Sequence, residues 1–327
     1  MIKIIANTVL GIILIFVWSR FVNIGQIIAT LSKFNLIYLL PIFAFMLLSP
    51  ILRAIRLKIF LSEVQKISLK DLIFLNGISQ ILNYFIPIRA GEIAKGIYLH
   101  TQYKMDLKKG VVWIFLDRFV DFLVVLMMAA IFLMIVPTAL NTNMVIITVL
   151  MFLGGVILTY LAIFNVSIFQ KLINFLMPLL IERHIKIYFA KFSHFILDSF
   201  KILKRSPKDL FLMIIITVLA YGADAAIWYF SFMALGSNQD FVKMYLGQLL
   251  SALTYLIPAA PGYIGSAEAS GLLVLSGILK IGTNLASATT VLLHVLSAIF
   301  IIIFGLISIF SLKIDLKEIM QKALKRS

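Results

Sequence analysis

The chain has 327 residues, of which 62% are hydrophobic and 13% are charged, and its mean hydropathy is +1.08. Soluble globular proteins are roughly 45–50% apolar and about 25% charged, so this composition excludes a soluble fold and predicts an all-α polytopic membrane protein. The formal net charge of +15 would suggest nucleic-acid binding in a soluble protein. In a membrane protein, Lys and Arg instead gather on the cytoplasmic side, close to anionic lipid head groups. We therefore expect no nucleic-acid partner.

The chain contains no cysteine, which excludes disulfides, thiol catalysis and cysteine-based metal sites. Its four histidines are His100, His184, His194 and His294, and their spacing matches no metal-binding motif such as HExxH. We therefore expect neither a metal nor a cofactor.

Six apolar segments predict membrane spans, which take about 20 helical residues each. They lie at 4–18, 36–60, 111–136, 144–164, 210–235 and 283–312. The first segment also resembles a signal peptide, but Trp18-Ser19-Arg20 is not a small-residue cleavage site. We therefore predict that this segment is retained as a span.

Two further apolar regions are each interrupted by proline and glycine. The first has residues 72–86 and 92–99 on either side of its break, and the second has 242–257 and 264–279. Each piece is short for a bilayer, so we predict two re-entrant helical hairpins. Broken backbone at membrane depth is tolerated where it is buried in protein or lines a wet cavity. The residues that break the helices are Pro87, Gly91, Pro258, Pro261, Gly262 and Gly265.

The two breaks share one pattern, which is tyrosine, two apolar residues, proline, three residues and glycine. Pro87 and Pro258 are 171 positions apart, and the same offset relates Gly91 to Gly262. An offset of about half the chain indicates one structural unit used twice.

We predict a single integral membrane domain over residues 1–327, with a first repeat at about 36–136 and a second at about 209–312. Between the repeats, residues 168–208 place apolar side chains at helical spacing, with Lys and Arg facing elsewhere. This pattern favours a basic amphipathic linker helix that lies in the head-group plane.

The distribution of basic residues predicts the orientation in the cell membrane. We place Arg89 and Arg118 at membrane depth, and most other basic residues, including Arg53, Arg56 and Lys95, on the side taken as cytoplasmic. The opposite side receives Arg20, Lys33, Lys243 and Lys280. Both termini are then cytoplasmic, and the two repeats have inverted topology. Inverted repeats with broken helices at mid-membrane are a recurring architecture of transporters.

Ionisable side chains at membrane depth are costly and usually mark a functional site or a paired structural contact. Here they are Arg89, Glu92, Asp117, Arg118, Asp121, Asp224 and Glu268. All of these except Asp224, together with Asn83 beside the first break, form the candidate substrate-binding set. Asp224 and His294, in the middle of spans, are the secondary candidates.

Structural interpretations stand beside the functional one for two of these groups. Arg118 can pair with Asp117 or Asp121 in an ion pair near the cytoplasmic rim. Asp224 can cap or hydrogen-bond a neighbour. Neither contact would require a ligand.

The first break carries the chemistry of an anion site. Free N–H groups at the helix opened by Gly91 would favour an anion, and Arg89 would clamp a phosphate with a fork geometry that Lys lacks. Glu92 would hold this arginine or take a proton that couples transport. The second break has Glu268 but no arginine, so the predicted phosphate site is asymmetric.

Three motifs together resemble the lysylphosphatidylglycerol synthase transmembrane-region family, also described as flippase-like integral membrane proteins. The motifs are Asn83 with Pro87-x-Arg89-x-Gly91-Glu92, then Leu116-Asp117-Arg118 with Asp121, and finally Pro258-x2-Pro261-Gly262-x2-Gly265-x2-Glu268. The resemblance spans nearly the whole chain. A basic residue frequent in the family's last helix stands here as His294.

The resemblance implies a lipid flippase-like module. In bifunctional members a soluble aminoacyl-transferase domain follows the membrane region, whereas this sequence stops at Ser327, so synthase activity is not expected. Other relatives are associated with polyprenyl-phosphate glycan pathways, which leaves the lipid open.

Three functions compete. The first is a transporter that moves an anionic phospholipid or a polyprenyl-phosphate-linked lipid. The second is a non-catalytic membrane partner of a separate synthase or glycosyltransferase, and an oligomer is compatible with either. The third, a lipid-linked transferase, is disfavoured because the sequence has no DxD, no HxxxxD and no nucleotide-phosphate loop. We expect the chain not to be an enzyme.

Overall fold

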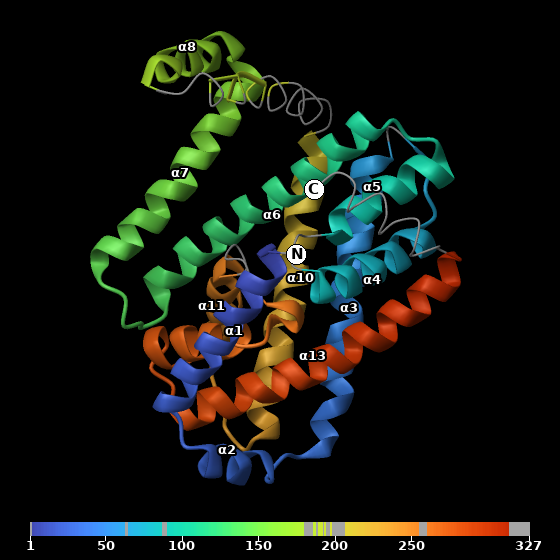
Figure 1. Cartoon of the computed structure of the whole chain (residues 1–327). Coiled ribbons are helices and arrows are strands. Elements are labelled where there is room, and N and C mark those ends of the chain that lie inside the picture. The colour runs from blue at the N-terminus through green and yellow to red at the C-terminus, as the bar shows by residue number, and fades with distance from the viewer. Residues whose placement is uncertain are drawn as a thin grey trace.

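The computed structural model describes residues 2–62, 65–86, 90–179, 207–254 and 260–313, with a few positions between 186 and 197 (Figure 1). Every regular element in these residues is helical, which confirms the predicted all-α class. Pro87, Arg89 and Pro258 lie outside the described residues, as does about half of the predicted linker at 168–208.

Five helices of the described chain are long and apolar enough to cross a membrane. They are α3 (Leu39–Leu61, preceded by the 3₁₀ turn η1, Leu36–Tyr38), α6 (Leu107–Ile135), α7 (Thr142–Phe164), α10 (Pro207–Ala234) and α13 (Thr283–Leu312). The helices α1 (Ile2–Phe21) and α2 (Ile24–Leu31), which are bent by 87° relative to each other, form either a sixth, broken span or a re-entrant loop. Five or six candidate spans in the described chain are consistent with the six predicted.

Side-chain caps set several helix starts. Asn23, Ser68 and Asn141 each accept a hydrogen bond from the backbone N–H three residues ahead, at 2.9–3.0 Å. Such caps satisfy N–H groups that have no partner within the helix. The helices α2, α4 (Leu69–Phe85) and α7 therefore begin where the sequence places a short polar side chain before an apolar run.

The two predicted hairpins are present. The first consists of α4 (Leu69–Phe85) packed against α5 (Ala90–Tyr103). The second begins with α11 (Phe241–Thr254) and returns through the 3₁₀ turn η3 (Pro261–Tyr263), α12 (Ser266–Gly271) and the π-helical turn η4 (Leu272–Ile278). The returning arm, predicted at 264–279, is thus built from three short helical pieces of different type.

The helix α4 runs antiparallel to α13, and glycines bring the two backbones close together. A Cβ added to Gly77 would lie 2.1 Å from Ser308 Oγ, and one added to Gly305 would lie 2.5 Å from Ile81 Cβ. The C-terminal end of α4 lies near His294, within α13, and does not reach Thr283, where α13 begins. In Figure 1, α13 crosses the whole molecule, while α4 and α5 lie along one half of it.

The hairpins start from opposite ends of the molecule and meet at their tips. The spans α3 and α10 are antiparallel neighbours, since the N–H of Asn35 before α3 donates to the C=O of Ala234, the last residue of α10 (2.9 Å). The hairpin that follows α3 and the hairpin that follows α10 therefore begin at opposite ends. Their tips touch, with the rings of Tyr84 and Tyr263 5.9 Å apart.

The helix α7 stands apart from the other spans and continues into α8 (Val166–Leu176) and the 3₁₀ turn η2 (Met177–Leu179) (Figure 1). It packs mainly against α6 and α8. Many of its apolar side chains are exposed, among them Ile147, Leu150, Met151 and Ile157. The face of α7 turned away from α6 is therefore a surface for lipid or for another protein.

Candidate functional site

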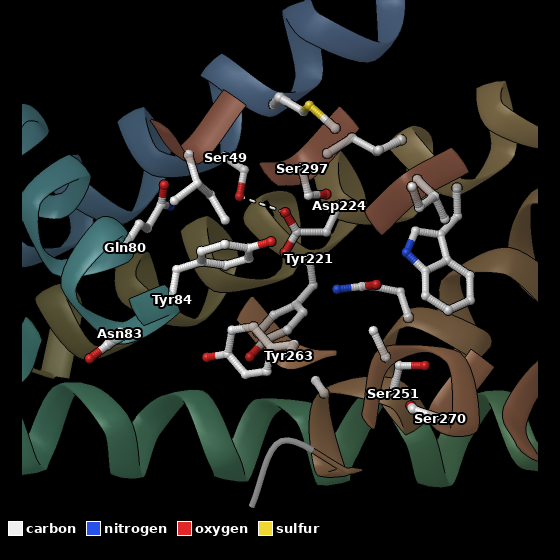
Figure 2. Close-up of a pocket in the computed structure, with 18 of the residues that line it drawn as sticks. Ser49, Gln80, Asn83, Tyr84, Tyr221, Asp224, Ser251, Tyr263, Ser270 and Ser297 are labelled. Carbon is white, nitrogen blue, oxygen red and sulfur yellow. Dashed lines mark hydrogen bonds between the residues drawn. The ribbon is translucent and has the colours of Figure 1, made fainter. Parts of the chain in front are cut away.

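A cavity of about 780 Å³ lies between the two hairpins and the spans α3, α6, α10 and α13 (Figure 2). Six of the predicted site residues line it, namely Asn83, Glu92, Arg118, Asp121, Asp224 and His294. Positions that are far apart in the sequence thus share one chamber. Asp117 and Glu268 lie directly behind its wall, where they pair with lining residues.

The second break needs glycine at two positions. Gly262 has φ +70° and Gly265 has φ +80°, in the left-handed region that side chains disfavour. A Cβ on Gly265 would also lie 2.1 Å from the carbonyl oxygen of Gly11 in α1. The predicted role of both glycines as helix breakers is consistent with this backbone, which turns against the ring of Tyr84.

Each hairpin caps its own returning helix. The N–H of Gly91 donates to Asn83 Oδ1 at 2.8 Å, and the N–H of Gly265 donates to Glu268 Oε2 at 2.8 Å. We predicted free N–H groups at Gly91 that would bind an anion, and this prediction is wrong for Gly91 itself. The side chain of Asn83 takes the place that we assigned to the anion.

Arg118 pairs with both aspartates on its own helix, so the predicted ion pair is present. Its guanidinium lies 2.8 Å from Asp117 Oδ2 and 3.2 Å from Asp121 Oδ2. Arg56 from α3 completes the group, with Nε 2.9 Å from Asp117 Oδ1 and a second contact to Asp121. Its side chain is buried, with a hydrogen bond to Thr217 of α10 at 2.8 Å. This charged cluster joins three spans.

Three basic residues assigned to the cytoplasmic side by sequence lie elsewhere. Arg56 is buried, and Arg53 lines the cavity with its guanidinium 2.7 Å from Asp224 Oδ2. Lys95 is also buried, with Nζ 3.6 Å from Glu92 Oε2. Basic side chains near the end of a span usually reach the interface, but these turn inward because carboxylates compensate their charge. The carboxylates lie on α6 and α10 for the two arginines and on the same helix, α5, for Lys95.

Asp224 has two partners. Besides Arg53, the hydroxyl of Ser49 donates to it at 2.6 Å (Figure 2). The expectation that Asp224 bonds a neighbour is therefore confirmed. A signal for this site was available in the sequence: Ser49, Arg53 and Arg56 recur at positions i, i+4 and i+7 and so share one face of α3.

His294 links the last span to the second break. Its Nδ1 lies 2.6 Å from Glu268 Oε1, and its Nε2 lies 2.7 Å from the carbonyl oxygen of Gly262. The hydroxyl of Tyr84 is 3.5 Å from Nε2. Glu268, His294 and the Gly262 carbonyl, which we call the His294 bridge, tie α13 to η3 and to α12.

Several polar atoms on the wall have no protein partner among the described residues. They are Gln80 Oε1 on α4, Ser251 Oγ on α11 and Arg118 Nε on α6, all buried. Buried polar groups are normally hydrogen-bonded, and these three atoms are exceptions in residues that line the cavity. No group of three or more His, Asp or Glu side chains within the described residues is placed to hold a metal ion.

Comparison with known proteins gives one match. The family model described as "Lysylphosphatidylglycerol synthase TM region" matches residues 4–305. A search of curated proteins and a search of solved structures each find no match.

Proposed function

The chain belongs to the lysylphosphatidylglycerol synthase transmembrane-region family, and from this premise we propose that it moves a lipid with an anionic head group between the leaflets of the cell membrane. The lipid is an anionic phospholipid or a polyprenyl-phosphate-linked lipid, and it is not chemically altered. Both termini face the cytoplasm in this proposal.

One observation carries the proposal, which is the polar cavity with the partly exposed guanidinium of Arg118 on its wall. A volume of about 780 Å³ falls within the roughly 300–1,000 Å³ range of small-ligand sites. Arg118 uses its terminal nitrogens for Asp117 and Asp121, and its side chain is 37% exposed where it lines the cavity. An exposed guanidinium can also bind a phosphate oxygen, and charge-assisted hydrogen bonds of this kind are strong.

The arrangement of the hairpins supports transport rather than storage of the lipid. The tips meet at Tyr84 and Tyr263 beside the cavity, and each hairpin leads to a different end of the molecule. Moving one tip would connect the cavity to one face of the membrane, and moving the other would connect it to the opposite face. This is the behaviour of inverted repeats with broken helices.

A second offset relation supports the repeat. Arg53 on α3 and Asp224 on α10 are 171 positions apart, the same offset as between the two breaks, and they pair with each other. Equivalent residues of two inverted units can meet only near the axis that relates the units. The salt bridge therefore marks where this axis would pass.

The Arg118→Lys variant tests the proposal. Lysine keeps a charge for the two aspartates but has no Nε–H and no planar fork. Loss of one charge-assisted hydrogen bond is expected to slow lipid movement about tenfold. The measurement is the quenching of fluorescently labelled phosphatidylglycerol by dithionite in vesicles that contain the purified chain.

Arg20→Lys is the matched control, because Arg20 lies at the exposed end of α1 with its guanidinium over the ring of Phe16. It should move lipid at the rate of the unmodified chain. Equal rates for all three proteins would contradict the role of Arg118. A chain that moves no labelled lipid at all would contradict the transport proposal.

The exposed face of α7 favours one alternative, a non-catalytic partner of a separate synthase or glycosyltransferase. Its span packs mainly against α6, which leaves an apolar face free for a partner helix. Gentle extraction that yields a stoichiometric subunit, together with a chain that does not transport alone, would support this alternative over ours.

A further inference from the structure

The ring of His294 lies between two hydrogen-bond acceptors. The Gly262 carbonyl oxygen, 2.7 Å from Nε2, can only accept a hydrogen bond, so Nε2 must carry a hydrogen. The carboxylate of Glu268, 2.6 Å from Nδ1, also accepts when it is ionised. A neutral imidazole carries one N–H and can satisfy only one of these two contacts.

The geometry therefore requires one proton more than a neutral histidine and an ionised glutamate hold together. The proton sits on Nδ1, giving an imidazolium beside a carboxylate, or on Glu268 Oε1, giving a carboxylic acid beside a neutral ring. The number of bound protons is the same in both cases. The other oxygen of Glu268 is already occupied, because it accepts the N–H of Gly265 at 2.8 Å.

The surroundings isolate this proton from other charges while leaving it access to water. The side chains of His294 and Glu268 are 16% and 9% exposed, and His294 lines the cavity. From the outer side the break is covered by α1, which has no ionisable side chain between Thr8 and Trp18.

Other ionisable side chains face the cavity from the surrounding elements. They are Tyr84 on α4, Tyr263 on η3, Tyr221 and Asp224 on α10, Arg53 on α3, Glu92 on α5, and Arg118 and Asp121 on α6. Among them the hydroxyl of Tyr84 is near the ring, at 3.5 Å from Nε2. Most of the others pair among themselves, as do Arg53 with Asp224 and Arg118 with Asp121.

We propose that the His294 bridge is a proton-binding site, and that the bound proton holds η3 and α12 of the second break against α13. When the proton leaves for water in the cavity, a ring nitrogen without hydrogen faces either Gly262 or Glu268. One of the two ties is then lost, and η3 or α12 is released from α13. The tie is present at low pH and is lost as pH rises. This inference rests on the proposed function only in taking the break as the gate of the transport cavity.

Nitrogen NMR tests the proton itself, without any transport. The full chain, labelled with ¹⁵N-histidine and held in lipid nanodiscs, is titrated from about pH 5 to about pH 9, the range in which histidine usually changes charge. We expect both nitrogens of His294 to carry hydrogen at low pH, or Nε2 alone with an infrared band of protonated Glu268. The signal is assigned by its absence in His294→Gln. An ionised Glu268 beside a ring with bare Nδ1 throughout the titration would overturn the proposal.

Cysteine labelling tests the closing of the break. The chain has no cysteine, so Ala267→Cys places a single thiol on the cavity wall, next to Glu268. Its reaction with a water-soluble maleimide is compared with that of the same thiol in a Glu268→Gln background. A glutamine can still accept from Gly265 through its oxygen and can donate to Nδ1 through its amide, so the bridge is complete without an extra proton. Because both proteins carry the same thiol, its own pH dependence cancels in the ratio.

The ratio is the labelling rate of the Ala267→Cys protein divided by that of the protein that also carries Glu268→Gln. We expect this ratio to rise several-fold as pH increases across the titration of the bridge. A ratio that does not change with pH would contradict the closing role. Adding His100→Gln to the Ala267→Cys protein is the matched control, because His100 contacts the Met105 carbonyl at the far end of α5. With this substitution the ratio should rise with pH as it does without it.

The outcomes separate this inference from the proposed function. A bridge that binds a proton and closes the break, in a chain that moves no labelled lipid, would contradict the transport proposal alone. Lipid movement by a chain whose bridge holds no extra proton would contradict the inference alone.

Discussion

Arg56 is the residue that holds the charged wall of the cavity together. It lies on α3, is 1% exposed, and contacts Asp117 and Asp121 on α6 as well as Thr217 on α10. Two buried carboxylates without this arginine would share Arg118 alone. The cost of burying a charge is tolerable only when it is paired and hydrogen-bonded.

Replacement of Arg56 by methionine should therefore destabilise the fold strongly. The expected loss is about 3–5 kcal/mol in the free energy of unfolding, which is typical of a buried ion group that loses one partner. Reversible chemical unfolding of the purified chain in detergent micelles measures it. Arg20→Met, at an exposed site, serves as the comparison, and a similar small loss in both variants would contradict the central role of Arg56.

The sequence was informative about acidic residues and less so about their partners. The aspartates at 117, 121 and 224 were predicted at membrane depth because each interrupts an apolar run. Arg53 and Arg56 were assigned to the cytoplasmic rim because they stand near the end of an apolar segment. Whether such a side chain extends to the interface or turns inward depends on the carboxylates of α6 and α10, which no local pattern of α3 reveals.

At the scale of elements, glycine determines how closely the helices of a hairpin pack. The returning helix α5 passes so near α4 that a Cβ on Gly91 would lie 2.2 Å from the carbonyl oxygen of Ser79. A carbonyl of the helix backbone cannot move aside as a flexible side chain can. The predicted break at Gly91 thus serves close helix contact as well as the turn.

Gly91→Ala should accordingly separate α5 from α4 and lower the thermal unfolding temperature, whereas Gly154→Ala should not. Gly154 lies on α7 with nothing within 4 Å of an added Cβ. There alanine should be neutral or stabilising by up to about 1 kcal/mol, because it favours helix more than glycine does. Thermal unfolding followed by fluorescence-detected size-exclusion chromatography compares the two, and equal shifts would contradict the packing argument.

Both hairpins were predictable because proline and glycine cannot continue an apolar helix. The 87° bend between α1 and α2 was not, since it depends on a distant contact. The N–H of Asn23 at the bend donates to Asn284 Oδ1 at the start of α13, 3.0 Å away. The π-helical turn η4 was missed for a similar reason, because no local residue pattern marks it.

At the scale of the whole molecule, the two ends differ in charge as the sequence predicted. At the sparsely basic end, the N–H of Asn35 before α3 donates to the C=O of Ala234 at the end of α10. At the same end, the N–H of Ala139 in the turn after α6 donates to the C=O of Ile278 at the end of η4. The other end contains the start of α4 and the link from α5 to α6, both rich in lysine. Which end faces the cytoplasm stays a prediction.

Cysteine scanning determines the orientation. Lys33→Cys and Lys66→Cys place single thiols at exposed positions of the two ends. In intact cells a membrane-impermeant maleimide should label position 33 and not position 66, because the lysine-rich end is expected inside. Both positions should react after solubilisation, and the reverse pattern in intact cells would invert the topology.

The caps at Asn83 and Glu268 have a mechanical consequence. Each cap belongs to the same hairpin as the N–H that it satisfies, at Gly91 and at Gly265. A hairpin that shifts as a rigid body therefore keeps this hydrogen bond, so neither N–H group is left without a partner in the hydrocarbon during the movement. The cost of motion then falls on the few contacts between bodies, such as the tyrosine pair, rather than on the backbone.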